Sequence, residues 1–153
     1  PGAILWLTLF RDKIDEIMEQ VKCPVAVFVN RQYREGSAVS FVLGGMIDLF
    51  LFSYLDKMLQ NGHSVRLFLF DTDDEEFRGH IDDLQVRYPE QTMIVWFAGV
   101  EDLVTEEKDG LLIMSHLSYT KLSEDEAVMR ELSSLLVIRR NKNTGDKNEG
   151  LEN

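Results

Sequence analysis

The chain has 153 residues, of which 44% are hydrophobic and 28% charged, a composition typical of one globular domain rather than of a disordered segment. Its 16 basic and 27 acidic residues leave a net charge of −11, which disfavours a nucleic acid as partner because phosphate binding depends on Lys and Arg. The single cysteine, Cys23, excludes an intramolecular disulfide and a cysteine-cluster metal site, and it fits a reducing, cytosolic compartment.

The first part of the chain combines one helix pattern with two strand patterns. Apolar residues spaced by three and four are typical of one helix face, and Pro24 ends that pattern because proline cannot continue a helix. The apolar start, residues 3–10, could instead be a strand. The predicted elements are a helix over 3–21, a strand over 25–29, a polar linker over 30–37 and a strand over 38–43.

In the middle of the chain, helices alternate with strands. Asn61-Gly62 is a typical helix end, and the acidic residues at 71–74 offer side chains that cap the next helix. The predicted elements are a helix over 47–60, a strand over 65–70, a helix that turns Phe77, Ile81, Leu84 and Val86 inward before Tyr88-Pro89 stops it, and a strand over 92–97.

The apolar pattern in the last part of the chain predicts two strands with a short helix between them. The predicted elements are an acidic connection over 99–109 that could hold a short helix, a strand over 111–116, a helix over 124–132 with Ala127, Val128 and Leu132 inward, and a strand over 135–138 with its flanks. The tail, 141–153, has almost nothing to bury and is expected to be disordered.

This alternation predicts an α/β fold of three layers, in which a mostly parallel sheet carries helices on both faces. In such sheets ligands bind beyond the carboxyl ends of the strands, where the strand order reverses. The candidate ligand-binding residues are those at or just after the ends of predicted strands, namely Asn30, Gly44, Gly45, Asp71, Gly99, Ser115 and His116.

The apolar stretch at 38–55 has the length of a short membrane span. Asp48 in its middle disfavours a span, because an ionised carboxylate there costs about 2.5–3.5 kcal/mol on insertion scales, and Gly44-Gly45 interrupts the run. No signal peptide pattern opens the chain. The absence of an initiator Met predicts that Pro1 lies inside a longer polypeptide.

The acidic residues are concentrated in one segment, 71–109, which holds 13 acids and three bases for a net charge of −10. The rest of the chain is near neutral. The simplest interpretation is a well-solvated flank of the domain. The alternative is a surface that attracts cations or a basic partner through its long-range field.

Two short motifs resemble the cytosolic C-terminal region of monovalent cation:proton antiporters of the second family, a region similar to a tandem of universal-stress-protein units. Cys23-Pro24-Val25 and the strand after it resemble the end of the first unit. The strand that ends in Gly44-Gly45, followed by Asp48, resembles the start of the second unit, which adds Asp48 to the candidate ligand-binding residues. The resemblance implies three regions: 1–30 as the last helix and strand of a preceding unit packed on the same sheet, 31–140 as a universal-stress-protein-like (adenine nucleotide hydrolase-like) unit, and 141–153 as the tail.

The resemblance implies a regulatory domain of a membrane Na⁺ or K⁺/H⁺ antiporter, on the cytoplasmic side of the cell membrane, which binds or interacts without catalysis or cofactor. Its partners would be the transmembrane domain of the same polypeptide and a small-molecule effector. We also expect a homodimer, because the apolar strand at 135–140 would seek a partner if it formed an exposed sheet edge.

The alternative implied by the same fold is a soluble, nucleotide-binding universal-stress-type protein. Such proteins wrap phosphates with a glycine-rich loop after the fourth strand of the unit. Here no glycine occurs between Leu111 and Gly145, and Gly44 stands where the family has an Asp. The only basic residues expected near strand ends are Arg31, Arg34 and Lys121, whereas Asp71 would repel a triphosphate. The sequence therefore predicts no tight ATP site.

A third alternative, a small hydrolase or transferase, lacks a recognisable nucleophile and base. Three histidines, His63, His80 and His116, are scattered, and no metal site is expected from them. Cys23 precedes a proline at the start of a strand, which predicts a small buried hydrophobic residue rather than a nucleophile. Motifs of serine hydrolases, zinc proteases and phosphate-binding loops are absent.

Overall fold

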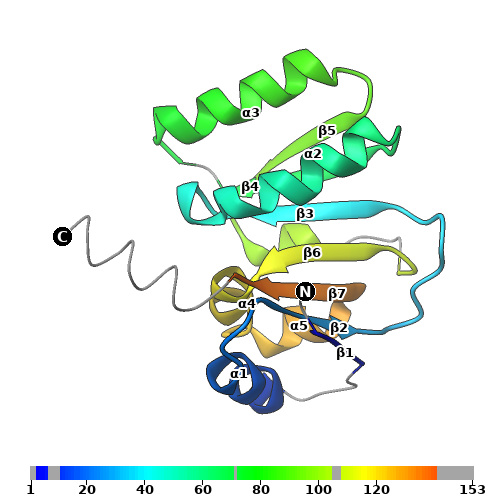
Figure 1. Ribbon diagram of the computed structural model, residues 1–153, viewed down its shortest axis with the longest axis vertical. Helices are drawn as coiled ribbons and strands as arrows, with labels where there is room; N and C mark the ends of the chain where they lie inside the picture. Colours follow the sequence, from blue (N-terminus) through cyan, green and yellow to red (C-terminus); the bar gives the residue numbers. More distant parts are fainter. Residues whose placement is uncertain (1–2, 7–10, 71, 105–107, 141–153) are drawn as a thin grey trace.

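A computed structural model describes residues 3–6, 11–70, 72–104 and 108–140. Within these ranges seven strands form one sheet in the order β1-β2-β7-β6-β3-β4-β5 (Figure 1). The strands are β1 (Ala3–Trp6), β2 (Val25–Val29), β3 (Val39–Leu43), β4 (Val65–Phe70), β5 (Thr92–Phe97), β6 (Leu111–Ser115) and β7 (Ser134–Arg139). The helices are α1 (Arg11–Gln20), α2 (Phe52–Gln60), α3 (Glu75–Arg87), α4 (His116–Leu122) and α5 (Glu126–Glu131), with the 3-10 helices η1 (Met46–Leu51) and η2 (Val100–Leu103).

The sheet is mostly parallel, as predicted. Strands β7, β6, β3, β4 and β5 run in one direction, whereas β1 and β2 run in the other. The antiparallel pair β2–β7 places Val25 opposite Arg139 and Val29 opposite Leu135. The strand order reverses between β3 and β6, because the chain first moves outward through β4 to β5 and then returns to the other side of β3.

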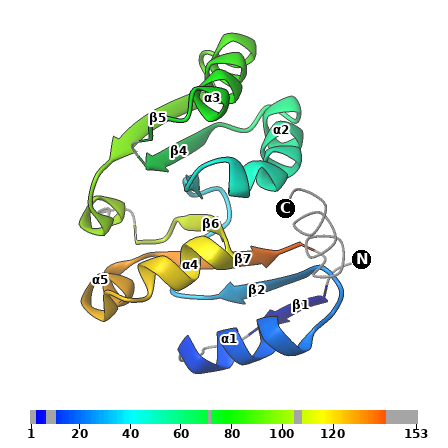
Figure 2. The ribbon, with the colours of Figure 1, turned by 90° about the vertical axis from the view of Figure 1, so that its left-hand side faces the viewer.

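Helices pack on both faces of this sheet, which confirms the three-layer α/β prediction. On one face, α2 and α3 cover a core that includes Phe41, Leu55 and Phe77. On the other, α1, α4 and α5 cover a core that includes Met18 and Leu122. Figure 2 shows α2 and α3 beside β4 and β5, and α1, α4 and α5 beside the strands at the opposite end of the sheet. The apolar runs of the central strands explain this arrangement, since each strand contributes side chains to both cores.

Local signals set the ends of the helices. The Asp74 side chain caps α3 by accepting a hydrogen bond from the Phe77 N–H at 3.2 Å. The helix ends at Arg87, just before Tyr88-Pro89, as predicted. At the end of α2, Gly62 has φ +87°, a left-handed conformation that glycine adopts at little cost. Residues 47–60 are not one helix, however, because η1 precedes α2.

Several predictions about the first and last elements were wrong. Residues 3–6 form strand β1, the alternative that periodicity left open, and the helix begins at Arg11. Hydrogen bonding to β2 decides this, since β1 pairs with it along its whole length. The helix predicted over 124–132 is the shorter α5. Ala127, which was predicted to face inward, is exposed, and Met129 is buried instead. Val86 is 79% exposed, and Cys23 is exposed rather than buried.

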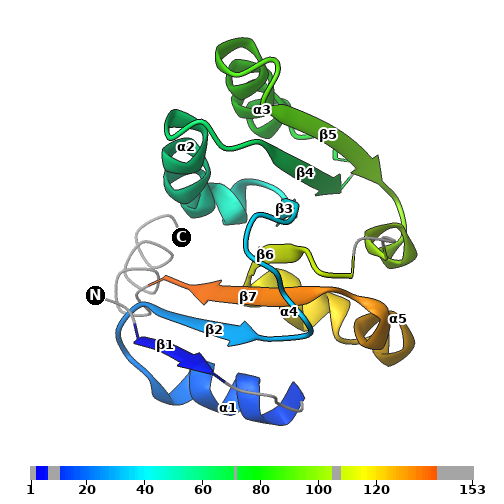
Figure 3. The same ribbon diagram turned by 90° about the vertical axis from the view of Figure 1, so that its right-hand side faces the viewer.

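The apolar strand that was expected to form a dimer edge lies inside the sheet. β7 pairs with β2 on one side and with β6 on the other, so 135–140 offers no free edge. Figure 3 shows β7 between these two strands. The tail at 141–153 and Asp71 lie outside the described residues. No helix in the described part of the chain has both the length and the hydropathy needed to cross a bilayer.

Candidate functional site

The strand-order reversal between β3 and β6 brings together most of the predicted ligand-binding residues. β3 ends at Leu43 and leads into Gly44-Gly45 and η1, which carries Asp48. β6 ends at Ser115 and leads directly into α4, whose first residue is His116. Because β3 and β6 are parallel neighbours, both chain segments leave the sheet at the same edge. This is the position at which α/β sheets bind ligands.

Asp48 is the centre of this cluster, and its side chain is completely buried. Its Oδ2 accepts hydrogen bonds from the Gly44 N–H at 2.6 Å and from the Ser118 hydroxyl at 3.0 Å. The other oxygen, Oδ1, is buried without a hydrogen-bond partner among the described residues. Burying a carboxylate is costly unless its oxygens are hydrogen-bonded, so the site has capacity for one more donor at Oδ1.

The two glycines before Asp48 have separate reasons to be glycine. A Cβ at Gly44 would lie 3.2 Å from Asp48 Oδ2 and 3.4 Å from Ser118 Oγ, so a side chain there would crowd the carboxylate. Gly45 has φ +138° and ψ −160°, a conformation that is essentially restricted to glycine. The Gly44-Gly45 pair therefore lets the chain turn sharply and place Asp48 against the Gly44 N–H.

A cavity of about 410 Å³ adjoins this cluster. It lies where η1, α1, α4 and the end of β7 meet, and its volume falls in the usual range of ligand pockets, roughly 300–1,000 Å³. Its lining combines acidic, basic and apolar groups: Glu19, Ile47, Asp48, Phe50, Ser115, His116, Leu117, Thr120, Ile138, Arg139 and Arg140. A pocket with this mixed lining suits a small polar molecule that forms several directed hydrogen bonds.

Ser115 and His116, two of the predicted residues, hold α4 in place. The Ser115 hydroxyl accepts a hydrogen bond from the Ser118 N–H at 3.1 Å and so caps the helix. His116 Nε2 lies 2.9 Å from Asp15 Oδ1, which joins α4 to α1. Residues 116–122 therefore form a helix in the position where a phosphate-wrapping loop would follow β6.

Arg139, at the carboxyl end of β7, connects the segment around the end of α1 to this end of the sheet. Its guanidinium donates hydrogen bonds to the carbonyl oxygens of Met18 and Val21, and to that of Cys23 at 2.7 Å. These contacts satisfy carbonyls at the end of α1, which helices otherwise leave unpaired. Arg139 also lines the cavity, and its Nε is buried without a hydrogen-bond partner in the described chain.

Asn30 and Gly99 do not join the cluster. β2 is antiparallel to β7, so the carboxyl end of β2 and Asn30 lie at the opposite end of the strands from the Asp48 cluster. Arg31 lies there too, bonded to the carbonyl oxygens of Met129 and Leu132, and burial lowers its pKa from the usual value. Gly99 follows β5, two strands away from β3.

Sequence reasoning missed several polar residues of the site, among them Ser118, Arg139 and Arg140. Of the three expected basic residues, Arg31 and Arg34 lie at the opposite end of the strands, where the Arg34 N–H donates to the Asp109 carbonyl just before β6. The third, Lys121, is exposed in the last turn of α4. The sequence did offer one signal for Arg139, because this residue lies at the end of a predicted strand, where ligand-binding residues were expected. Strand direction, which the sequence does not show, decides which edge that end occupies.

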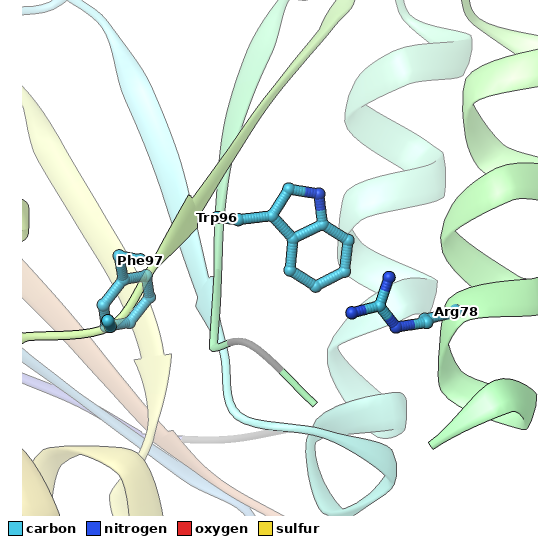
Figure 4. A pocket seen from close by; sticks show the side chains of 4 residues that line it. Arg78, Trp96 and Phe97 are labelled. Carbon is cyan, nitrogen blue, oxygen red and sulfur yellow. The ribbon is translucent and has the colours of Figure 1, made fainter. Parts of the chain in front are cut away.

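A second, shallower cavity of about 290 Å³ lies at the far end of the sheet, between α3 and β5. The Arg78 guanidinium lies 4.5 Å from the centre of the Trp96 ring, in the geometry of a cation–π contact. Arg78 Nε also donates to the Thr72 carbonyl at 2.6 Å. Figure 4 shows Trp96 and Arg78 facing each other, with Phe97 on the other side of the strand.

The described residues contain no group of three or more His, Cys, Asp or Glu side chains placed to hold a metal ion. Comparisons with protein-family models, with curated proteins and with solved structures found no match to this chain.

Proposed function

We propose that this chain is a regulatory domain of a membrane cation:proton antiporter and that it binds a small-molecule effector beside Asp48. One observation carries the proposal: a completely buried carboxylate, with one unpartnered oxygen, lies at the strand-order reversal and lines a cavity of about 410 Å³. Gly44, Gly45 and Asp48, which carry the resemblance to this family, belong to that cluster, where Asp48 accepts the Gly44 N–H bond.

The cluster favours binding over catalysis. Asp48 is held by two donors, and His116 contacts Asp15 rather than a serine or cysteine nucleophile. A nucleophile needs a base within hydrogen-bond reach, and the groups around the cavity are engaged in positioning helices. The chemistry that remains is recognition, in which Asp48 Oδ1 accepts a hydrogen bond from an N–H or O–H group. We propose a small neutral or cationic effector.

Two measurements test the antiporter role. The open reading frame that encodes this chain should also encode about a dozen hydrophobic spans, each of roughly 20 residues. The whole protein, reconstituted in liposomes, should then exchange Na⁺ or K⁺ for protons. We expect Asp48→Asn to shift the cation concentration for half-maximal exchange by roughly fivefold, the scale of allosteric coupling, while the maximal rate stays within about twofold.

Asp82→Asn is the matched control, because Asp82 is an exposed acid on α3 away from the cluster. It should leave both parameters unchanged. A reading frame without membrane spans overturns the antiporter proposal. Equal effects of the two substitutions overturn the regulatory role of the Asp48 site.

The same site predicts weak binding of ATP. Residues 116–122 form helix α4, and the Ser118 N–H is already bonded to the Ser115 hydroxyl, so this segment does not wrap phosphates as a glycine-rich loop would. Asp48 adds a buried negative charge, and two like charges 4 Å apart repel by about 4 kcal/mol at an effective dielectric constant of ~20. We expect isothermal titration calorimetry with MgATP at 0.15 M salt to give no dissociation constant below about 10 µM. Tighter binding would favour the nucleotide-binding alternative.

A further inference from the structure

The outer edge of β5 offers unpaired main-chain groups. β5 pairs with β4 along Thr92–Phe97 and with no other described strand. The Gln91 carbonyl accepts a bond from the Val65 N–H at 2.8 Å, so odd-numbered residues of β5 turn their main-chain groups toward β4. The main-chain groups of Ile94 and Trp96 therefore point away from the sheet.

This edge lacks the features that usually protect a strand from pairing. Proteins shield exposed edges with charged residues, prolines, bulges or very short strands. β5 is six residues long, and its sequence, TMIVWF, contains neither a charge nor a proline. Met93 is 59% exposed and Trp96 is 41% exposed, so both faces of the strand present a large apolar side chain at the edge. An edge of this kind favours the addition of another strand.

The charge around this edge selects the partner. β5 lies in the middle of the acidic segment 71–109, whose described residues, 72–104 and 108–109, hold ten acids and three bases. Of the basic residues in this segment, Arg87 is paired with Asp56 and Asp83, and Arg78 stacks on Trp96. A second copy of this chain pairing through β5 would bring two such acidic segments together. A basic segment would instead meet an opposite charge on approach and on binding.

We infer that β5 binds an extended, Lys/Arg-rich peptide segment as an added strand of the sheet. Main-chain hydrogen bonds to Ile94 and Trp96 would hold the peptide. Apolar side chains on one face of the added strand would contact Met93 or Trp96, and basic side chains on its other face would lie toward the acidic flank. The inference rests on the edge and the charge alone, so it goes beyond the proposed effector site and does not depend on it.

Amide hydrogen exchange, read by NMR on the whole chain, tests this inference. The probe is an eight-residue peptide that alternates Lys and Val, and the comparison peptide alternates Glu and Val. Saturation with the Lys–Val peptide should slow exchange of the Ile94 and Trp96 amides by roughly tenfold or more, because these N–H groups gain a partner. The Glu–Val peptide should leave both amides unchanged.

Two substitutions distinguish binding at the β5 edge from nonspecific attraction to the acidic segment. Met93→Lys places a positive charge on the edge strand itself and should weaken Lys–Val peptide binding by roughly tenfold, since like charges oppose each other across a strand pair. Val86→Lys adds the same charge on α3, at a residue that is 79% exposed, and should change binding by less than about twofold. Both side chains are mostly exposed, so both variants should fold.

Three outcomes would overturn the inference. The first is an absence of protection at Ile94 and Trp96 with the Lys–Val peptide. The second is a lack of specificity, seen either as equal protection by the Glu–Val peptide or as equal weakening by the two substitutions. The third is a dimer of the free chain, detected by light scattering, that Met93→Lys abolishes, because the edge would then bind a second copy. None of these results bears on the Asp48 site, which lies at β3 and β6.

Discussion

Replacing Asp48 with alanine should lower the free energy of unfolding by about 2–4 kcal/mol, because one buried donor and one partly buried donor would lose their acceptor at a cost of about 1–2 kcal/mol each. The donors are the Gly44 N–H at 2.6 Å and the Ser118 hydroxyl at 3.0 Å. The Asp48 side chain also links η1, after β3, to α4, after β6. Its loss should therefore weaken the packing on both sides of the strand-order reversal.

Urea denaturation followed by circular dichroism measures this effect. Asp48→Asn keeps the shape and one oxygen acceptor, so it should recover part of the loss. Asp82→Ala, at an exposed position on α3, should change the free energy of unfolding by no more than about 0.5 kcal/mol. If Asp48→Ala were as stable as Asp82→Ala, the hydrogen bonds to Asp48 would contribute nothing, and its burial would need a purely functional explanation.

Replacing Phe41 with alanine should have the largest effect on stability, a loss of about 3–5 kcal/mol, as for other fully buried phenylalanines. Phe41 is completely buried in β3, an inner strand of the sheet that leads to Gly44 and Asp48. Its ring packs with the core beneath α2 and α3, which includes Leu55 and Phe77. The cavity left by alanine would remove dispersion contacts with the residues of this core.

The same denaturation experiment tests Phe41. Phe41→Leu should lose less than Phe41→Ala because it leaves a smaller cavity. Met93→Ala is the control on β5, since Met93 is 59% exposed and contributes little to the core. An equal, small loss for Phe41→Ala and Met93→Ala would contradict the placement of Phe41 at the centre of the fold.

Local patterns in the sequence determined most of the elements. The strands at β2, β4 and β5 were predicted at the bounds that the structure shows, as were the caps and ends around α3. Periodicity and capping depend on residues no more than about four positions apart, so they can be read directly from the chain. The three-layer α/β class followed from the same alternation of elements.

The sequence also located the main part of the site. Gly44, Gly45, Ser115 and His116 were predicted to lie near a strand-order reversal, and the family resemblance added Asp48. The structure brings these five residues together between β3 and β6. Candidate residues that directly follow parallel strands are brought to one edge because those strands share a direction. The effector and the antiporter role remain predictions.

Only the tertiary structure decided which strands are neighbours and in which direction they run. The reversed direction of β2 moved Asn30 to the far edge, and the parallel pairing of β7 placed Arg139 at the Asp48 site. The tertiary structure also placed β7, the strand that was expected to form a dimer edge, inside the sheet. The edge strand is β5 instead. These outcomes depend on pairs such as Val25 with Arg139, which lie more than 100 residues apart. No local pattern encodes such pairs, because they are selected by the packing of the whole core.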